Sequence, residues 1–281
     1  MRALLPNSLK EAMAMITAEP SPPTPMAGAT DLLVHWPVLG AARDRTYLDL
    51  SALRELRTIR WDNGRLTLGA MTTYWDVVRD DRIGKEFPLL VAAARQVGAI
   101  QIQARGTWAG NIANASPAAD GVPVLMAYDA TAELISPDGK TSEVALDRFY
   151  SGYKQMAMRK DQLITAIHLP RRAHSFGVFE KVGARRAQTI TKVGVAAAHS
   201  DAGWRIVVNS VAPTIRRCRT LERFLDAGGS GKPAHRPDDL VPLLAPDISP
   251  IDDIRSTAAY RRTVLARLIY HHLRGRTPAI V

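Results

Sequence analysis

Two short segments rich in small residues have the composition of phosphate-binding loops. Small side chains let backbone N–H groups approach phosphate oxygens closely, and Thr and Asn side chains add further donors. Taken alone, each segment predicts either a diphosphate site or a tight turn without a ligand. The two segments are loop 1, Ala27-Gly28-Ala29-Thr30-Asp31-Leu32, and loop 2, Gly106-Thr107-Trp108-Ala109-Gly110-Asn111.

Other familiar active-site motifs are missing from the sequence. It contains no G-x-G-x-x-G after a strand, no H-E-x-x-H and no G-x-S-x-G. The run from Gly228 to Lys232 resembles a Walker loop, but Asp226 and Pro233 stand where Gly and Ser/Thr are required. We therefore interpret this run as a loop, and the motif search gives no candidate metal site and no candidate catalytic residue.

The single cysteine limits the chemistry further. One Cys excludes an internal disulfide, a four-Cys zinc site and a Cys-ligated iron–sulfur cluster within this chain. Cys218 follows two arginines, which favour the thiolate, but no histidine partner is evident. A structural role is the favoured interpretation, with a catalytic thiol as the alternative.

Charge divides the chain into two parts. The formal net charge is +10 over 281 residues, yet residues 1–170 hold equal numbers of basic and acidic side chains, so residues 171–281 carry the whole excess. This break predicts two structural units. A hydrophobic share of 46% with 23% charged residues excludes a disordered chain, and no apolar run is long enough to cross a bilayer. We expect a cytoplasmic protein without membrane insertion.

The first part must position the two loops. Asn7-Ser8 predicts the start of a helix, Asn63-Gly64 predicts a hairpin, and Thr72 or Thr73 predicts another helix start. The expected elements are a helix over residues 9–17, a hairpin over 59–68, helices ending at 78 and spanning 88–97, a hairpin over 131–146 and a strand over 163–169.

The second part has a different order of elements. Three strands are expected over residues 176–182, 189–199 and 204–211, followed by a short helix near 221–225 and a long helix from about 253 to 274. The long helix has an apolar stripe made of Ile254, Ala258, Leu265, Leu268 and Ile269. Strands followed by helices predict an α+β domain with a three-stranded sheet.

The residues after loop 2 raise the specificity of the pattern. The matching positions are Thr107, Gly110, Asn111, Ile112, Ala115, Ser116, Pro117, Ala119 and Asp120. This segment resembles T-I-G-G-N-I-x-x-A-S-P-x-A-D of the FAD-binding (middle) subunit of the molybdenum hydroxylases, the xanthine dehydrogenase and carbon monoxide dehydrogenase flavoprotein family. Loop 1 is similar to the A-G-G-T-D-L of that family.

The resemblance extends over nearly the whole chain. Residues 68–73 are similar to the strand and turn that precede the first domain helix of that family, and residues 161–170 to its D-E-L-I-x-x-I-x-I-P strand. Residues 179–182 and 190–193 resemble two short segments that contain lysine, and residues 253–262 resemble the closing D-x-R-a-S-A-x-Y-R-r helix. Because so many matches occur in the same order along the chain, the resemblance is specific to this family.

The resemblance implies a fold and a cofactor. It implies a two-lobed, vanillyl-alcohol-oxidase-type FAD domain over residues 1–170, with lobes at about 1–55 and 56–170, and a C-terminal α+β flavoprotein domain over 171–281. Loops 1 and 2 would bind the FAD pyrophosphate.

Four further positions are implied as FAD contacts. Asp120 would accept a hydroxyl of the ribose or adenosine side, Val97 would line the adenine, Ile164 would pack near the flavin, and Lys181 would reach FAD across the domain cleft. The alternatives are an Asx turn for Asp120 and ordinary core packing for Val97 and Ile164.

Two departures from the family pattern affect the loops. Ala29 replaces a usual Gly in loop 1, and Trp108-Ala109 replaces Ile-Gly in loop 2. Each change adds a Cβ near the expected diphosphate, and Trp108 adds a large ring. We expect FAD to be retained, in a slightly different position or with weaker affinity.

The resemblance also implies partners. A large subunit with a molybdenum–pterin centre would hydroxylate the substrate, and a small subunit with two [2Fe–2S] clusters would pass electrons to the FAD of this chain, which delivers them to an external acceptor. A dimer of such heterotrimers is expected. The alternatives are an FAD-free assembly subunit and a free-standing FAD oxidase; nucleic-acid binding is disfavoured, since the basic residues are dispersed and no RNA-binding motif is present.

Overall fold

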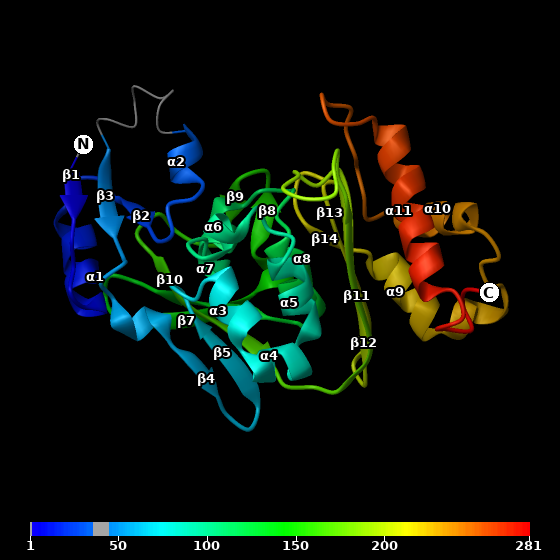
Figure 1. The fold of residues 1–281 in the computed structure, drawn as a ribbon, viewed down its shortest axis with the longest axis horizontal. Coiled ribbons are helices and arrows are strands. Elements are labelled where there is room, and N and C mark those ends of the chain that lie inside the picture. The colour runs from blue at the N-terminus through cyan, green and yellow to red at the C-terminus, as the bar shows by residue number, and fades with distance from the viewer. Residues whose placement is uncertain (1, 36–44) are drawn as a thin grey trace.

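The first lobe is a small parallel sheet with one helix packed against it. The computed structural model describes residues 2–35 and 45–281 (Figure 1). The sheet has the order β1-β3-β2, with β1 (Arg2–Leu4), β2 (Thr24–Met26) and β3 (Thr46–Asp49). Helix α1 (Leu9–Ala18) begins where expected, because the Ser8 side chain accepts a hydrogen bond from the Glu11 amide.

The second lobe contains a five-stranded antiparallel sheet. Its order is β4-β5-β10-β6-β7, and its strands are β4 (Ile59–Trp61), β5 (Arg65–Gly69), β6 (Thr131–Ile135), β7 (Thr141–Ala145) and β10 (Leu163–Pro170). Both predicted hairpins are confirmed as β4–β5 and β6–β7. Between β7 and β10 the chain forms a small sheet of β8 (Tyr150–Gly152) and β9 (Gln155–Met156).

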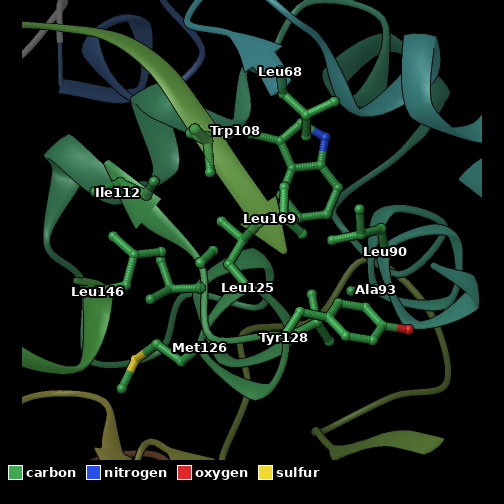
Figure 2. Packing of buried hydrophobic residues seen from close by; sticks show 14 of the residues in the cluster. Leu68, Leu90, Ala93, Trp108, Ile112, Leu125, Met126, Tyr128, Leu146 and Leu169 are labelled. Carbon is green, nitrogen blue, oxygen red and sulfur yellow. The ribbon is translucent and has the colours of Figure 1, made fainter. Parts of the chain in front are cut away.

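Short helices pack against this sheet and enclose the largest core cluster. Figure 2 shows part of that core, where Trp108, Leu125 and Leu169 lie among other fully or almost fully buried side chains. The helices of the N-terminal part after α1 are α2 (Leu32–His35), α3 (Tyr74–Arg79), α4 (Asp81–Glu86), α5 (Pro88–Ala94), α6 (Ile100–Gln103), α7 (Trp108–Asn114) and α8 (Gly121–Ala127).

The C-terminal domain is an antiparallel sheet covered by helices. Its strands follow chain order: β11 (His174–Val182), β12 (Val193–Ser200), β13 (Gly203–Asn209) and β14 (Arg216–Arg217). One face contacts α8 of the first domain, and the helices on the other side are α9 (Arg219–Asp226), α10 (Val241–Leu244) and α11 (Ala258–Leu273) (Figure 1). No helix in the described ranges is long and apolar enough to cross a membrane.

The C-terminal domain differs from the sequence-based expectation in two places. The sheet gains a fourth strand, β14, which is only two residues long and has no periodicity to reveal it. The long helix starts at Ala258, not near 253, because Thr257 caps it while Asp253 holds the preceding turn by accepting the amides of Arg255 and Ser256. Ile254 therefore lies outside the helix and is 99% exposed, so its place in the predicted apolar stripe was wrong.

Carboxylates of the first domain bind arginines from the residues after β10. Asp129 accepts from Arg172 and Arg205 at 2.8 and 2.7 Å, and Arg217 lies 3.6 Å away. Asp147 pairs with Arg219 at 2.5 Å. The basic excess of the C-terminal residues is thus partly used inside the molecule, where it holds the two domains together.

The domain junction predicts a stability effect. Replacing Asp129 by Asn removes the charge shared by these arginines, so we expect unfolding free energy to fall by about 1–3 kcal/mol, measured by urea denaturation. Asp138→Asn, in the exposed pair with Lys140, is the matched control and should change stability by less than about 0.5 kcal/mol. Equal effects of the two substitutions would contradict the role of Asp129 in holding the two domains together.

Candidate functional site

Loop 1 lies against the chain that leads into loop 2. A Cβ at Gly28 would sit 1.9 Å from the carbonyl oxygen of Arg105, so only glycine permits this approach. The Arg105 side chain in turn donates to the Gly28 carbonyl at 3.4 Å. Gly28 is therefore required first of all by the contact between the two lobes.

Loop 2 is held in place by backbone hydrogen bonds and a helix cap. The Tyr74 amide donates to the Gly106 carbonyl, and the Trp108 amide donates to the Thr72 carbonyl. Thr107 is the N-cap of α7, and its side chain accepts a hydrogen bond from the Gly110 amide at 3.0 Å. The cap explains Thr107, and the glycine three residues later fits because a Cβ at Gly110 would lie 2.8 Å from the Thr107 hydroxyl oxygen.

The structure brings the two predicted loops together. A Cβ at Gly106 would lie 3.4 Å from the Thr30 hydroxyl, and the Asn114 amide group donates to the Asp31 carboxylate at 3.0 Å. Loop 1 and α7 thus form one surface, although 83 positions separate Asp31 from Asn114 in the sequence.

Backbone donors remain available at this surface. The amides of Ala29, Thr30 and Asp31 have no acceptor among the described residues, and neither does the amide of Ala109 in the first turn of α7. Ala29 has a left-handed backbone with φ of 60°, and a left-handed residue in a turn is typical of the backbone nests that bind anions. Such an arrangement fits an anionic diphosphate without a lysine or arginine.

The Trp108 ring does not lie at this surface, so it does not add the bulk near the diphosphate that the sequence suggested. The side chain is fully buried in the core cluster (Figure 2). Its ring packs on Tyr74, with ring centroids 5.0 Å apart. The large ring therefore takes no space from a ligand at the loops; only the Cβ of Ala109, itself buried, and that of Ala29 remain as differences.

Asp120 and Lys181 are in direct contact across the domain boundary. The Lys181 ammonium donates to the Asp120 carboxylate at 2.6 Å and to the Gln96 carbonyl at 2.9 Å, while the Thr191 hydroxyl donates to the second Asp120 oxygen. Burial raises the pKa of Asp120, and the Lys181 charge and hydrogen bond oppose that rise. Asn111 links this pair to loop 2, because its side-chain oxygen accepts the amide of Gly121.

Val97 and Ile164 belong to the core. Ile164 is buried in β10, opposite Leu134 of β6, and Val97 is half-buried against the same cluster. The same cluster contains Trp108 and Ala109 of loop 2, and contact of Val97 or Ile164 with a cofactor stays a prediction.

Sequence reasoning missed several residues that build the site. Arg105 and Asn114 connect the loops, and Thr191 completes the Asp120 contacts. Thr191 lies in one of the lysine-containing segments noted above, which was the only signal for it. Cys218 is fully buried at the start of α9, and burial raises the pKa of its thiol well above the usual value, which makes it a core residue.

The fold is a mixed α and β structure whose two loops present backbone amides suited to a diphosphate, and comparison with known proteins identifies the class of protein. Residues 1–172 match the family described as "FAD binding domain in molybdopterin dehydrogenase", and residues 179–275 match "CO dehydrogenase flavoprotein C-terminal domain". The chain belongs to this family of FAD-binding subunits of molybdenum hydroxylases.

Individual relatives agree with this assignment. The putative xanthine dehydrogenase FAD-binding subunit of Escherichia coli is 29% identical over 253 residues, covering 86% of this chain and 82% of that protein. The glyceraldehyde dehydrogenase medium chain of Sulfolobus acidocaldarius is 31% identical over 268 residues, covering 92% of each. In the solved structure of reconstituted CO dehydrogenase from Oligotropha carboxidovorans, a chain of 25% identity superposes with a TM-score of 0.89, covering 100% of this chain and 98% of that one. This chain is thus an FAD-carrying oxidoreductase subunit.

The left-handed Ala29 predicts a gain in stability. Replacing it by glycine removes the steric cost of a positive φ, so we expect the unfolding free energy of the flavin-free chain to rise by about 1 kcal/mol. Ala27→Gly in the same loop is the control, and it should lower stability by about 0.5–1 kcal/mol, since Ala27 packs on the core at an ordinary φ. The prediction fails if both substitutions change urea denaturation in the same direction.

Breaking the buried ion pair between Asp120 and Lys181 should lower the stability of the fold, by an amount that depends on pH. Lys181→Met leaves Asp120 without its counter-charge, which raises the pKa of that carboxyl further and destabilises the fold by more than about 2 kcal/mol at neutral pH. The substitution destabilises only the charged form of Asp120, so the loss of unfolding free energy should shrink as the pH falls and this carboxyl takes up a proton. The loss should level off near the ordinary Asp pKa of about 3.9, below which Asp120 is protonated in the unfolded chain as well.

A double substitution tests the same contact. Asp120→Asn in the Lys181→Met background removes the stranded charge, so the doubly substituted chain should unfold at higher urea concentration than Lys181→Met alone. If the effects of the two substitutions on the unfolding free energy are additive, Asp120 and Lys181 do not act as a pair.

Proposed function

We propose that this chain is the electron-transfer subunit of a heterotrimeric molybdenum hydroxylase. In this proposal bound FAD takes electrons from [2Fe–2S] clusters of a small partner subunit and passes them to an external acceptor, while a large molybdenum–pterin subunit oxidises the substrate. The observation that supports it best is the convergence of loop 1 and loop 2, whose free amides suit a diphosphate.

The chain supplies binding and orientation. Loop 1 and loop 2 would hold the diphosphate through backbone amides, and the Gly28–Arg105 approach would fix the two loops relative to each other. Asp120 and Lys181 would line the side where the C-terminal domain closes on the second lobe, as the resemblance implies.

The names of relatives support an assembly with partners. Several similar proteins are named as medium chains or as subunits, among them the carbon monoxide dehydrogenase medium chain of Hydrogenophaga pseudoflava and the nicotine 6-hydroxylase medium subunit of Paenarthrobacter nicotinovorans. For this chain we propose a large and a small partner, a dimer of heterotrimers, a location in the cytoplasm, and domains divided near residue 170.

A substitution in loop 1 tests the electron path. In Gly28→Ala the new Cβ overlaps the Arg105 carbonyl, so the loops separate and FAD occupancy should fall at least about tenfold. When the purified complex is reduced anaerobically, its [2Fe–2S] clusters should be reoxidised by NAD, a quinone or oxygen at least about tenfold more slowly than in the unaltered complex, as followed by electron paramagnetic resonance. Gly84→Ala, on α4 with no atom within 4 Å of the added Cβ, is the matched control.

The outcomes separate the alternatives. A wild-type complex that assembles normally but releases no flavin when it is denatured indicates an FAD-free assembly subunit. Flavin reduction by substrate in the isolated chain indicates a free-standing oxidase. Cluster reoxidation that is equally fast in Gly28→Ala contradicts the proposed electron path.

A further inference from the structure

A cavity of about 540 Å³ lies in the C-terminal domain, away from the loops of the flavin site. It opens where β11, β12 and β13 meet the end of α9 and the residues that follow α11. Its volume falls in the range of small-molecule pockets, about 300–1,000 Å³. No predicted FAD contact lines it, and its chemistry comes from Ser175, Phe176, His199, Trp204, Asp226 and Arg276.

The floor of the cavity is a set of packed rings. Phe176 and Trp204 have ring centroids 5.5 Å apart, and His199 lies 4.7 Å from Trp204. Trp204 is only 5% exposed, so its ring is fixed in the domain core. The His199 ring is also oriented, because its Nδ1 and the Ser175 hydroxyl lie 2.8 Å apart in a hydrogen bond. Such a floor suits an aromatic or other flat apolar group.

Asp226 gives the cavity an oriented negative charge. It is the last residue of α9, where the negative end of the helix dipole disfavours a carboxylate. One of its oxygens accepts the Trp204 amide at 2.9 Å, and the other has no hydrogen-bond partner among the described residues. Gly203 has a φ of +86°, which favours glycine, and its Cβ position lies 2.9 Å from both oxygens of this carboxylate. An ammonium group is the natural partner for a carboxylate placed in this way.

Arg276 gives the cavity a positive charge. Its side chain is exposed and forms no ion pair or hydrogen bond with any described residue. The neighbouring Gly275 has no atom within 4 Å of its Cβ position, which leaves the rim open beside the guanidinium. A free guanidinium at an open rim suits a carboxylate.

We propose that this cavity binds a small zwitterion with an aromatic side chain, of the chemical class of the aromatic α-amino acids. The ammonium group pairs with Asp226, the carboxylate pairs with Arg276, and the ring packs over Phe176 and Trp204. This site is independent of the flavin loops and does not rest on the proposed electron-transfer function.

Three related probes test the proposal by isothermal titration calorimetry on the full chain. L-phenylalanine carries both charges, phenethylamine lacks the carboxylate, and 3-phenylpropanoate lacks the ammonium group. We expect L-phenylalanine to bind, and each singly charged probe to bind at least about tenfold more weakly, because each loses one charge-assisted contact. The absence of measurable L-phenylalanine binding overturns the proposal.

Two substitutions test which residue of the cavity pairs with each charged group of the ligand. Asp226→Asn keeps an oxygen that accepts the Trp204 amide, so the fold should be preserved while L-phenylalanine affinity falls at least about tenfold and 3-phenylpropanoate affinity does not fall. Arg276→Gln should weaken L-phenylalanine binding equally, and phenethylamine affinity should not fall.

Arg274→Gln is the matched control, since Arg274 is also exposed but does not line the cavity, and it should bind like the unaltered chain. Unchanged L-phenylalanine affinity in both cavity variants overturns the proposal, as does an equal loss in Arg274→Gln. The FAD content of every variant should stay normal, which separates this result from any failure of the flavin assignment.

Discussion

The close approach of Gly28 to the Arg105 carbonyl is the contact that brings loop 1 and loop 2 together, and the proposed flavin site depends on it. It joins a turn that follows β2 to the segment that enters α7, and so it brings two lobes with separate sheets into one surface. The other contacts between the loops, Thr30 with Gly106 and Asp31 with Asn114, are possible only at that spacing. A glycine that looks from sequence like a phosphate ligand is thus first a packing requirement, and the free amides beside it are the consequence.

The second constraint is electrostatic and lies between the domains. A buried carboxylate is costly unless it is paired, and Asp120 gains its partners, Lys181 and Thr191, from the C-terminal domain. Asp129 is met by arginines from the same part of the chain. In these contacts the first domain therefore supplies the anions and the second the cations, which accounts for part of the basic excess after residue 170.

Turns and helix caps were predictable from the sequence, whereas contacts between residues far apart in the chain were not. The Asn63-Gly64 hairpin and the Ser8 cap followed from turn and capping preferences that act within a few residues. The start of α11 was misplaced because Asp253 binds the backbone ahead of the helix. The inward direction of the Trp108 ring, and the pairing of Asp120 with a lysine 61 positions away, depend on tertiary packing that no local pattern encodes. The family resemblance implied an FAD contact for Lys181, which stays a prediction, and did not imply its pairing with Asp120.

The arginines at the domain junction have a practical consequence for work with fragments. In the intact chain Arg205, Arg217 and Arg219 face Asp129 and Asp147. A fragment that begins after β10 would keep these guanidinium groups and lose both carboxylates, so it would behave as a polycation. Such a fragment would retain nucleic acid from a cell extract and elute late from a cation exchanger. An affinity for nucleic acid measured on that fragment would reflect the cut surface and not a property of the whole subunit.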